Sequence, residues 1–423
     1  AAKPRKWRKR LLVGVGAAGG GVAAVAGFSY RNENQRRETE QLIRSVKETH
    51  IPTRGENLKR LASGEVFDIL VVGGGATGAG VALEAQLRGL NVACVEQEDF
   101  ASGTSSKSTK LLWAGSRYLV KALVKLFSPS SVLAPVSSFT DFLDTFSMVM
   151  HCFEERTYML QMNPHITNWV PIAVPLDKWI IWPPPFDYPP AALGPATGLF
   201  VVFFKVYDAL GSWAAPSSYV MSPRRAREEF PQMDTERMKY VSVFYEGAHN
   251  DARTNLAIAM TAAMYGSCIT NYAKVEEILF DDKGVASGCT VLDKANPDAK
   301  PFSVKAKKII YCGGPFTDGL RELSEGKDVK PVVNGSGGTH IVLPPYYCPR
   351  HLGMVDMMTS RGSFLFFLPW EGYTLVGTTD VKTGIFPAVC GVLFLLFVLR
   401  VLICYRINAR QVPEDEIQYL INV

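Results

Sequence analysis

The sequence contains no pair of cysteines at the CxxC spacing, and no cysteine and histidine pair at zinc-finger spacing. Its eight cysteines are scattered, at positions 94, 152, 268, 289, 312, 348, 390 and 404. This pattern excludes a zinc finger and a small disulfide-stapled scaffold, and we expect free thiols in a reducing compartment. Aspartate and glutamate never assemble at calcium-loop spacing either, so the sequence predicts no metal site.

Charge is also scarce, since only 20% of the residues are Asp, Glu, Lys or Arg. The net charge is +5, but 6 of the 45 basic residues lie in the first ten positions, so the remaining chain is nearly neutral. This distribution argues against general binding of nucleic acids. With 423 residues, 47% of them hydrophobic, the chain is long enough for two or three globular domains.

The first residues carry a targeting pattern. Residues 1–10 are strongly basic, residues 11–28 are uncharged and apolar, and no acidic residue precedes Glu33. This order is typical of a mitochondrial presequence or an inner-membrane anchor, with an ordinary flexible tail as the alternative. Six glycines within the apolar stretch weaken the case for a stable spanning helix.

A second apolar run covers residues 385–405 and is long enough to cross a bilayer as a helix, although Arg400 lies inside it. We consider three interpretations: a membrane span, a buried or interfacial hairpin, and an unspliced translation product. A span in the middle of a soluble domain is physically awkward because it separates the flanks of that domain across the bilayer.

The strongest local signal is a glycine-rich turn between a predicted strand and a predicted helix. After the mainly apolar strand predicted over residues 67–72 come Gly73, Gly75 and Gly78, which allow a tight turn, close approach of a pyrophosphate, and close packing of helix on strand. A second strand over 91–95 ends at Glu96, which is placed to bind a ribose hydroxyl. Together these features predict a dinucleotide-binding α/β domain.

The segment that follows the ribose acid favours FAD over NAD, because it offers many short hydroxyl and backbone donors to an elongated cofactor. We predict that its contacts come from five side chains: Thr104, Ser105, Ser106, Ser108 and Lys110.

These same residues resemble the FAD-dependent glycerol-3-phosphate dehydrogenases, and the mitochondrial branch more than the bacterial one. The resemblance begins with DILVVGGGATGAGVALEAQLRGL, EDFASGTSSKSTKL and RYL. It continues in the expected order through MVMHCFEERTYMLQMNPHI, FYEGAHNDARTNLAIAMTAA, GPFTD, GTHIVLP and FFLPWEGYTLVGTTD.

The resemblance implies an FAD-binding domain of the glutathione-reductase type, together with a substrate-capping domain on a mainly antiparallel sheet. Residues 303–313 are expected to be a returning strand of the FAD domain and residues 274–280 a further strand. The expected domains are 1–64 (targeting, anchor and linker), 65–125 and 241–320 (FAD-binding), 126–240 (helical, loop-rich), 321–380 (substrate-capping) and 381–423 (apolar segment and C-terminus).

The implied reaction is oxidation of glycerol 3-phosphate to dihydroxyacetone phosphate, with electrons passed through FAD to ubiquinone. It requires a base for the hydroxyl, cations for the phosphate and a dry flavin face. The resemblance assigns His340 as hydroxyl ligand or base, and places Arg117 and Tyr118 at the substrate. A hydrogen-bonded histidine at a strand end, and a surface Arg-Tyr pair on a helix, are the plain alternatives.

Two further segments are placed near the flavin by the resemblance. One is the loop Thr378, Thr379 and Asp380, for which a plain turn is the alternative; the other contains Gly314, a predicted cofactor contact. The chain departs from the family where Trp113 replaces a histidine and Ala114 a glycine, and where Cys312 and Gly313 begin the motif that the family reads ATGP. If the histidine touches flavin, Trp113 alters cofactor geometry.

Three stretches are expected to be insertions: residues 127–146 and 182–204, whose proline and serine suggest loops, and the apolar run after GTTD. The family's later arginine and lysine motifs are not found before Val423. We therefore weigh a fragment, one half completed by another chain, and a non-catalytic relative.

The favoured hypothesis is a mitochondrial inner-membrane flavoenzyme acting on glycerol 3-phosphate, with ubiquinone and the membrane as partners and either a homodimer or a larger respiratory assembly as its form. One alternative is an FAD-dependent oxidoreductase of 2-hydroxy acids or amino acids, which would need a bidentate arginine for the carboxylate. The other is an inactive membrane scaffold subunit that keeps the fold.

Overall fold

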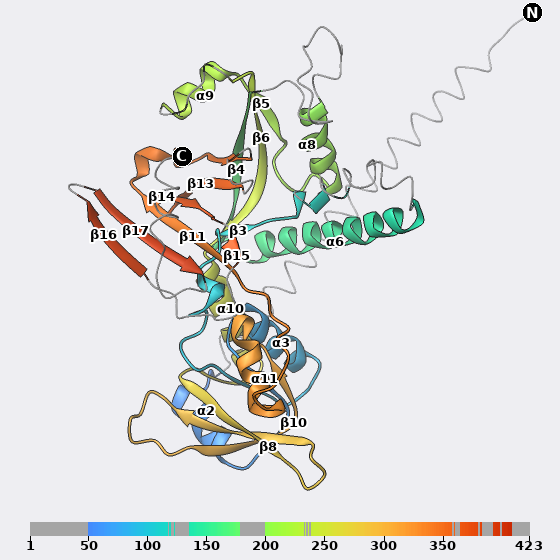
Figure 1. Cartoon of the computed structure of the whole chain (residues 1–423), viewed down its shortest axis with the longest axis vertical. Coiled ribbons are helices and arrows are strands. Elements are labelled where there is room, and N and C mark those ends of the chain that lie inside the picture. Colours follow the sequence, from blue (N-terminus) through green and yellow to red (C-terminus); the bar gives the residue numbers. More distant parts are fainter. Residues whose placement is uncertain are drawn as a thin grey trace, which may run out of the picture.

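Two sheets organise the chain into two lobes, shown below and above in Figure 1. The computed structural model describes residues 50–116, 118–119, 122, 135–177, 199–231, 233, 236, 238–357, 359, 364–379, 381–382, 392–397 and 400–407. The predicted targeting pattern, residues 1–28, lies outside the described residues, and of the predicted targeting and linker region 1–64 the structure describes residues 50–64. The lower lobe contains the six-stranded sheet and the upper lobe the eleven-stranded sheet.

The six-stranded sheet has the order β7-β2-β1-β10-β9-β8. Its strands are β1 (Val66–Val72), β2 (Val92–Val95), β7 (Cys268–Thr270), β8 (Ala273–Phe280), β9 (Ala286–Asp293) and β10 (Phe302–Tyr311). The strands in the first four positions are parallel, whereas β9 pairs antiparallel with β10 and β8 pairs antiparallel with β9. The strands predicted over 67–72, 91–95, 274–280 and 303–313 are confirmed.

Helices cover both faces of the parallel part. Alternate residues of β1 point to opposite sides, so Val71 packs with helices α3 (Ala76–Leu87) and α10 (Asp251–Met264). Leu70 on the other side packs with helices α2 (Arg54–Ala62) and α11 (Thr317–Glu325). Burial on both faces explains why β2 and the last four residues of β1 are continuous apolar runs rather than alternating ones.

The large sheet runs β16-β17-β11-β14-β13-β12-β4-β6-β3, with β15 beside β11 and β5 beside β6. Its strands are β3 (Leu111–Leu112), β4 (Thr167–Leu176), β5 (Tyr219–Met221), β6 (Tyr240–His249), β11 (Ser336–Leu343), β12 (Gly353–Asp356), β13 (Leu365–Trp370), β14 (Tyr373–Gly377), β15 (Val381–Lys382), β16 (Val392–Phe397) and β17 (Arg400–Ile407). All described pairings except β12 with β4 are antiparallel.

This arrangement confirms the predicted fold class, an FAD-binding Rossmann-like α/β domain with an antiparallel capping sheet. The chain crosses between the lobes more than once. The strand β6 starts at the predicted border near residue 241 and pairs with the large sheet, whereas α10, directly after it, packs on α3 of the smaller sheet. Among the described residues, the further helices of the upper lobe are α6 (Pro135–Met162), α8 (Leu199–Leu210) and α9 (Pro223–Glu229).

The predicted loop character of the first two insertions is wrong where the structure describes them. Residues 135–146 form the first part of α6, and residues 199–204 begin α8. Both helices contribute apolar side chains to the core of the upper lobe, including Phe153 of α6 and Phe204 of α8. Serine and proline near a helix start suit its N-terminus, so the composition misled the prediction.

Of the interpretations considered for residues 385–405, the described residues favour a hairpin over a membrane-spanning helix. Within this range β16 and part of β17 are antiparallel strands, and β17 pairs with β11 in the large sheet. A continuous aliphatic run of this kind is compatible with either a buried helix or strands by periodicity alone. Among the helices described here, none is both long and apolar enough to cross a bilayer.

Candidate active site

The glycine-rich turn between β1 and α3 is packed so closely that side chains do not fit. A Cβ atom at Gly73 would lie 2.4 Å from the carbonyl oxygen of Cys312, and one at Gly78 would lie 1.8 Å from the oxygen of Gly73. Gly73 also has a φ of 114°, which favours glycine. Gly75 is the N-cap of α3 and has no capping side chain of its own.

Polar groups converge on the start of α3. The backbone N–H of Ala76 donates to Oγ of Ser105 at 2.9 Å, which brings the predicted serine-rich segment to the helix N-terminus. From α10, Nδ2 of Asn255 donates to the oxygen of Gly74 at 2.9 Å. Asn255 is 2% exposed, and its Oδ1 finds no hydrogen-bonding partner among the described residues. A buried acceptor is thus left at the edge of the turn.

The predicted ribose acid lies where the sequence places it, at the end of β2. One oxygen of Glu96 accepts from the N–H of Gly74 at 2.5 Å, and the other accepts from the N–H of Glu98 at 2.9 Å. A carboxylate has about four lone-pair positions, so both oxygens can still accept from ribose hydroxyls.

The segment that contains Gly314 follows β10 and begins beside the same turn. The N–H of Cys312 donates to the oxygen of Val72 at 2.8 Å, which places the start of the 312–314 segment against the glycine turn. Gly314 has a φ of 55° and open space around its Cα, whereas a Cβ at Gly313 would lie 2.7 Å from Leu320.

A buried ion pair holds the end of the serine-rich segment. Nζ of Lys110 lies 2.9 Å from each carboxylate oxygen of Asp251, the first residue of α10, and donates to the oxygen of Ser106 at 2.6 Å. The N–H and Oγ of Ser108 both donate to Oδ2 of Asp251, at 3.0 and 2.8 Å. Thr104 forms the start of the short 3-10 turn Thr104–Ser106 that leads into this segment.

His340 lies fully buried on β11, beside this segment. Oγ1 of Thr109 is 3.1 Å from Nε2 of the imidazole. Burial, and next the ammonium of Lys110, lower the pKa of His340 to about 3, while the carboxylate of Asp251 opposes the shift. The ring is therefore neutral at physiological pH.

The GTTD loop contacts the strand that carries His340. The N–H of Thr339 donates to Oγ1 of Thr379 at 2.8 Å, and the N–H of Thr379 donates to the oxygen of Thr339 at 3.2 Å. A Cβ at Gly338 would lie 2.2 Å from Oγ1 of Thr378, so the strand and the loop are in direct contact. Asp380 lies outside the described residues.

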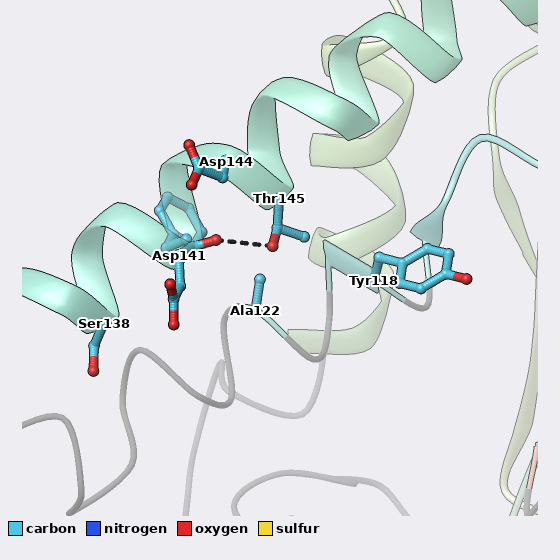
Figure 2. A pocket seen from close by; sticks show the side chains of 7 residues that line it. Tyr118, Ala122, Ser138, Asp141, Asp144 and Thr145 are labelled. Atoms are coloured by element: carbon cyan, nitrogen blue, oxygen red, sulfur yellow. Dashed lines mark hydrogen bonds between the residues drawn. The ribbon is translucent and has the colours of Figure 1, made fainter. Parts of the chain in front are cut away.

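The described contacts do not place the other two predicted catalytic residues, Arg117 and Tyr118, beside His340. Arg117 lies outside the described residues. Tyr118 is 54% exposed and lines a different hollow, of about 380 Å³, whose further lining comes from Ala122 and the first half of α6 (Figure 2). The α6 side chains there are Ser138, Asp141, Phe142, Asp144 and Thr145. The substrate roles of Arg117 and Tyr118 stay predictions.

Trp113, the notable departure from the family pattern, packs into the upper core. Its ring meets those of Phe244 and Phe366 edge-on, with centroids 6.0 and 5.3 Å away. The next residue, Ala114, donates its N–H to the buried carboxylate of Glu246 at 3.3 Å. The indole thus anchors this stretch in the apolar core.

Sequence reasoning missed three residues of the site: Thr109, Asp251 and Asn255. Asp251 and Asn255 are one helical turn apart on α10 and both point to the cofactor lobe's glycine and serine segments. The sequence signal for Asp251 and Asn255 was the stretch NDARTN. In this stretch the N-cap Asn250 precedes Asp251 and Asn255, two polar residues that are buried here but that an ordinary surface helix would expose. Within the described part of the chain, no three His, Cys, Asp or Glu side chains gather as a metal site.

The family model for FAD dependent oxidoreductases matches residues 68–423, which is most of the chain. The chain belongs to this family. It is 41% identical over 340 residues to the mitochondrial glycerol-3-phosphate dehydrogenase of Mus musculus, a match that covers 79% of this chain and 42% of the relative. With the Homo sapiens protein of the same name it shares 39% identity over 388 residues, covering 89% of this chain and 48% of the relative.

A solved structure supports the same family assignment. The glycerol-3-phosphate dehydrogenase from Bacillus halodurans, complexed with FAD, superposes with a TM-score of 0.55 at 26% identity, covering 78% of this chain and 50% of that one. The sequence-based identification of the family is thereby confirmed. The chain spans about half the length of the curated relatives it matches.

The residues present fit FAD, the family's cofactor. Close packing at Gly73 and Gly78 sets the start of α3 directly against the end of β1, α3 has no acidic residue in its first turn, and Glu96 is available to a ribose. The buried acceptor of Asn255 adds a polar position for an incoming hydroxyl or an ordered water.

Proposed function

We propose that this chain carries out FAD-dependent oxidation of sn-glycerol 3-phosphate to dihydroxyacetone phosphate, with the electrons passed on to ubiquinone. The observation that carries the proposal is the single segment 104–110, which touches the nucleotide turn through Ser105 and the neutral imidazole of His340 through Thr109. We infer the identity of the substrate from the relatives, since those with 39 and 41% identity are named glycerol-3-phosphate dehydrogenase.

Gly73, Gly75 and Gly78 would hold the pyrophosphate, and Glu96 the ribose. When bound, FAD supplies the acceptor for a hydride from the carbinol carbon of the substrate. The protein must then orient the substrate hydroxyl, receive its proton and exclude water.

His340 supports the proton step because its ring is neutral and buried. A neutral imidazole can accept a hydrogen bond from the substrate hydroxyl, which a protonated ring cannot. A phosphate dianion arriving nearby raises the pKa of an imidazole, so the substrate itself strengthens His340 as a proton acceptor. Arg117 is the proposed partner of the phosphate.

The first test is an anaerobic titration of the FAD-loaded chain with sn-glycerol 3-phosphate, followed by the visible flavin absorbance. We expect bleaching by this substrate, little by sn-glycerol 1-phosphate or glycerol, and strong slowing in His340→Asn with unchanged FAD content. A flavin that stays oxidised with sn-glycerol 3-phosphate, or that bleaches with an amino acid or 2-hydroxy acid instead, would overturn the proposal.

We further propose that the chain works at the mitochondrial inner membrane and delivers electrons to ubiquinone there. Its support is the basic, then apolar N-terminal pattern and the mitochondrial names of the relatives. A short-chain ubiquinone should reoxidise the substrate-reduced protein, and a fluorescent fusion of the full chain should fractionate with inner membranes. Failure of reoxidation, or fractionation elsewhere, would contradict these points separately.

A further inference from the structure

The imidazole of His340 is held from two sides. In the register between β11 and β14 it lies opposite Gly377, where an added Cβ would come within 2.6 Å of its Cδ2 atom. On another side, Oγ1 of Thr109 is 3.1 Å from Nε2. The glycine gives the ring a backbone surface to lie on, and the hydroxyl gives one nitrogen a directional partner.

Thr109 is itself fixed through both of its neighbours in the chain. Ser108 donates its N–H and its hydroxyl to Asp251, and Lys110 donates to both oxygens of the same carboxylate. One buried acid therefore clamps the residues before and after Thr109. Lys110 has a φ of 65°, a conformation that turns the chain sharply at this point.

The helix that provides this acid also fixes the nucleotide turn. One turn after Asp251, Asn255 donates to the oxygen of Gly74. Because α10 holds both parts, a change in the position of Thr109 is tied to the position of the glycine turn. A short series of hydrogen bonds, through residues 108–110 and α10, thus connects the imidazole to the glycine-rich turn.

We propose that Thr109 is a positioning residue, which sets the ring orientation and tautomer of His340, and that Asp251 fixes Thr109 for this task. The inference rests on the proposed function, because it assigns His340 the hydroxyl of the substrate. It deepens that function by naming the contact that prepares the imidazole before the substrate arrives. An ordinary core histidine would keep its orientation by packing alone.

The direct test does not need turnover. In FAD-loaded protein carrying ¹⁵N-labelled histidine, the ring nitrogens of His340 are assigned by their loss in His340→Asn and compared between variants. We expect Thr109→Val, which keeps the side-chain shape, to shift and broaden the Nε2 resonance, and Thr109→Ser to restore it. Unchanged His340 resonances in Thr109→Val would overturn the proposal, whatever the substrate proves to be.

A kinetic arm then relates the contact to the reaction. Thr109→Val should lower the rate of flavin bleaching by sn-glycerol 3-phosphate about five- to tenfold, the effect of one neutral hydrogen bond, with little change in KM. Thr109→Ser should recover most of the rate. The matched control is Thr261→Val on α10, whose lost hydroxyl donates to the Ala257 carbonyl of the same helix.

The two arms separate the inference from the function on which it rests. If the parent protein does not bleach but the ¹⁵N shifts occur as expected, the proposed function fails and the positioning contact stands. If the parent bleaches and Thr109→Val is as fast as the parent, the positioning role fails and the function stands. Equal slowing in Thr109→Val and Thr109→Ser would also overturn it, since the hydroxyl would then be irrelevant.

Discussion

A single methyl group added at Gly78 would prevent α3 from packing against the glycine-rich turn as it does here. Its Cβ would lie 1.8 Å from a backbone oxygen that cannot rotate away. We expect Gly78→Ala to reduce the free energy of unfolding by about 1 to 3 kcal/mol and to lower the FAD bound per chain. Thermal unfolding and the flavin absorbance of purified protein measure both effects.

Gly80, two residues further along α3, provides the control. A Cβ there meets nothing within 4 Å, so Gly80→Ala should keep FAD and raise helix stability by up to about 1 kcal/mol. Equal FAD content in the two alanine variants would show that the close packing at Gly78 does not matter for the cofactor.

His340 should make the protein sensitive to acid. Its pKa falls from 6.5 to about 3 on burial, so below about 6.5 the unfolded chain binds a proton that the folded chain does not. The free energy of unfolding therefore decreases as the pH drops through this window, by about 1.4 kcal/mol per pH unit from this group. His340→Gln should flatten that slope in denaturant titrations.

The exposed His351 gives the comparison, since its side chain is 70% exposed beside Glu229. His351→Gln should leave most of the acid slope intact. A slope that persists undiminished in His340→Gln would mean that other groups, such as the half-buried His249, dominate the acid response.

The sequence predicted the glycine chemistry of the site because that chemistry is local: a turn, a helix start and the end of the next strand lie within about 30 residues. It could not predict Thr109 or Asp251, because their roles depend on contacts to His340 and Lys110, more than 100 positions away. His340 was predicted only through the family resemblance. Its catalytic role, like the substrate contacts of Arg117 and Tyr118, stays a prediction.

Among the elements, α6, α8 and β6 meet at a buried cluster of charge. Glu246 of β6 is fully buried and bonds to Arg156 of α6 and to the hydroxyl of Tyr207 of α8. Burial raises the pKa of Glu246, and the arginine opposes this. The guanidinium also lies 5.0 Å from the rings of Phe153 and Trp169. The cluster therefore fixes two helices on one strand.

Replacing one member of the Arg156–Glu246 pair should lower the free energy of unfolding more than replacing both. Arg156→Met leaves a buried carboxylate without its cation, and we expect a loss of about 3 to 5 kcal/mol in the free energy of unfolding. Adding Glu246→Leu should recover much of that loss, since paired apolar replacements remove the uncompensated charge. Guanidinium titrations of the single and double variants measure this, and simply additive losses would contradict it.

At this scale the sequence located strands well, misjudged the starts of two helices, and left open whether residues 385–405 form a helix or a hairpin. The strands β1, β2, β8 and β10 have turn signals at their ends and fixed burial patterns. The start of α6 contains serine, threonine and proline, which resemble a loop until the packing of its later turns is known. The run in β16 and β17 is uniformly aliphatic, so its periodicity does not separate strands from a helix.

For the whole molecule, the fold class and the family were predictable, and both are confirmed, because the motifs occur in order along most of the chain. The way in which the lobes are joined was not predictable, since it depends on β6 and α10 lying in different lobes although they adjoin in sequence. At that junction, Thr109 of the segment predicted to bind FAD contacts His340.

FAD should accordingly stabilise both lobes together. A ligand that binds only the folded state adds about 2.7 kcal/mol when its free concentration is 100 times its dissociation constant. We expect calorimetry of the FAD-loaded chain to show one transition shifted upward, and a much smaller shift in Gly78→Ala. Two transitions, of which only one responds to FAD, would show that the lobes are energetically independent.

The pairing of β1 with β10 has a consequence for synthesis. Val66 aligns with Lys305 and Val72 with Tyr311. The central strand β1 therefore cannot pair with β10 until the ribosome has synthesised that much later part of the chain. At about 5 to 20 residues per second, the roughly 240 intervening residues occupy a ribosome for on the order of tens of seconds. Throughout that time one apolar edge of the nascent Rossmann unit is unpaired, which makes it a natural client for chaperones until the returning strand emerges.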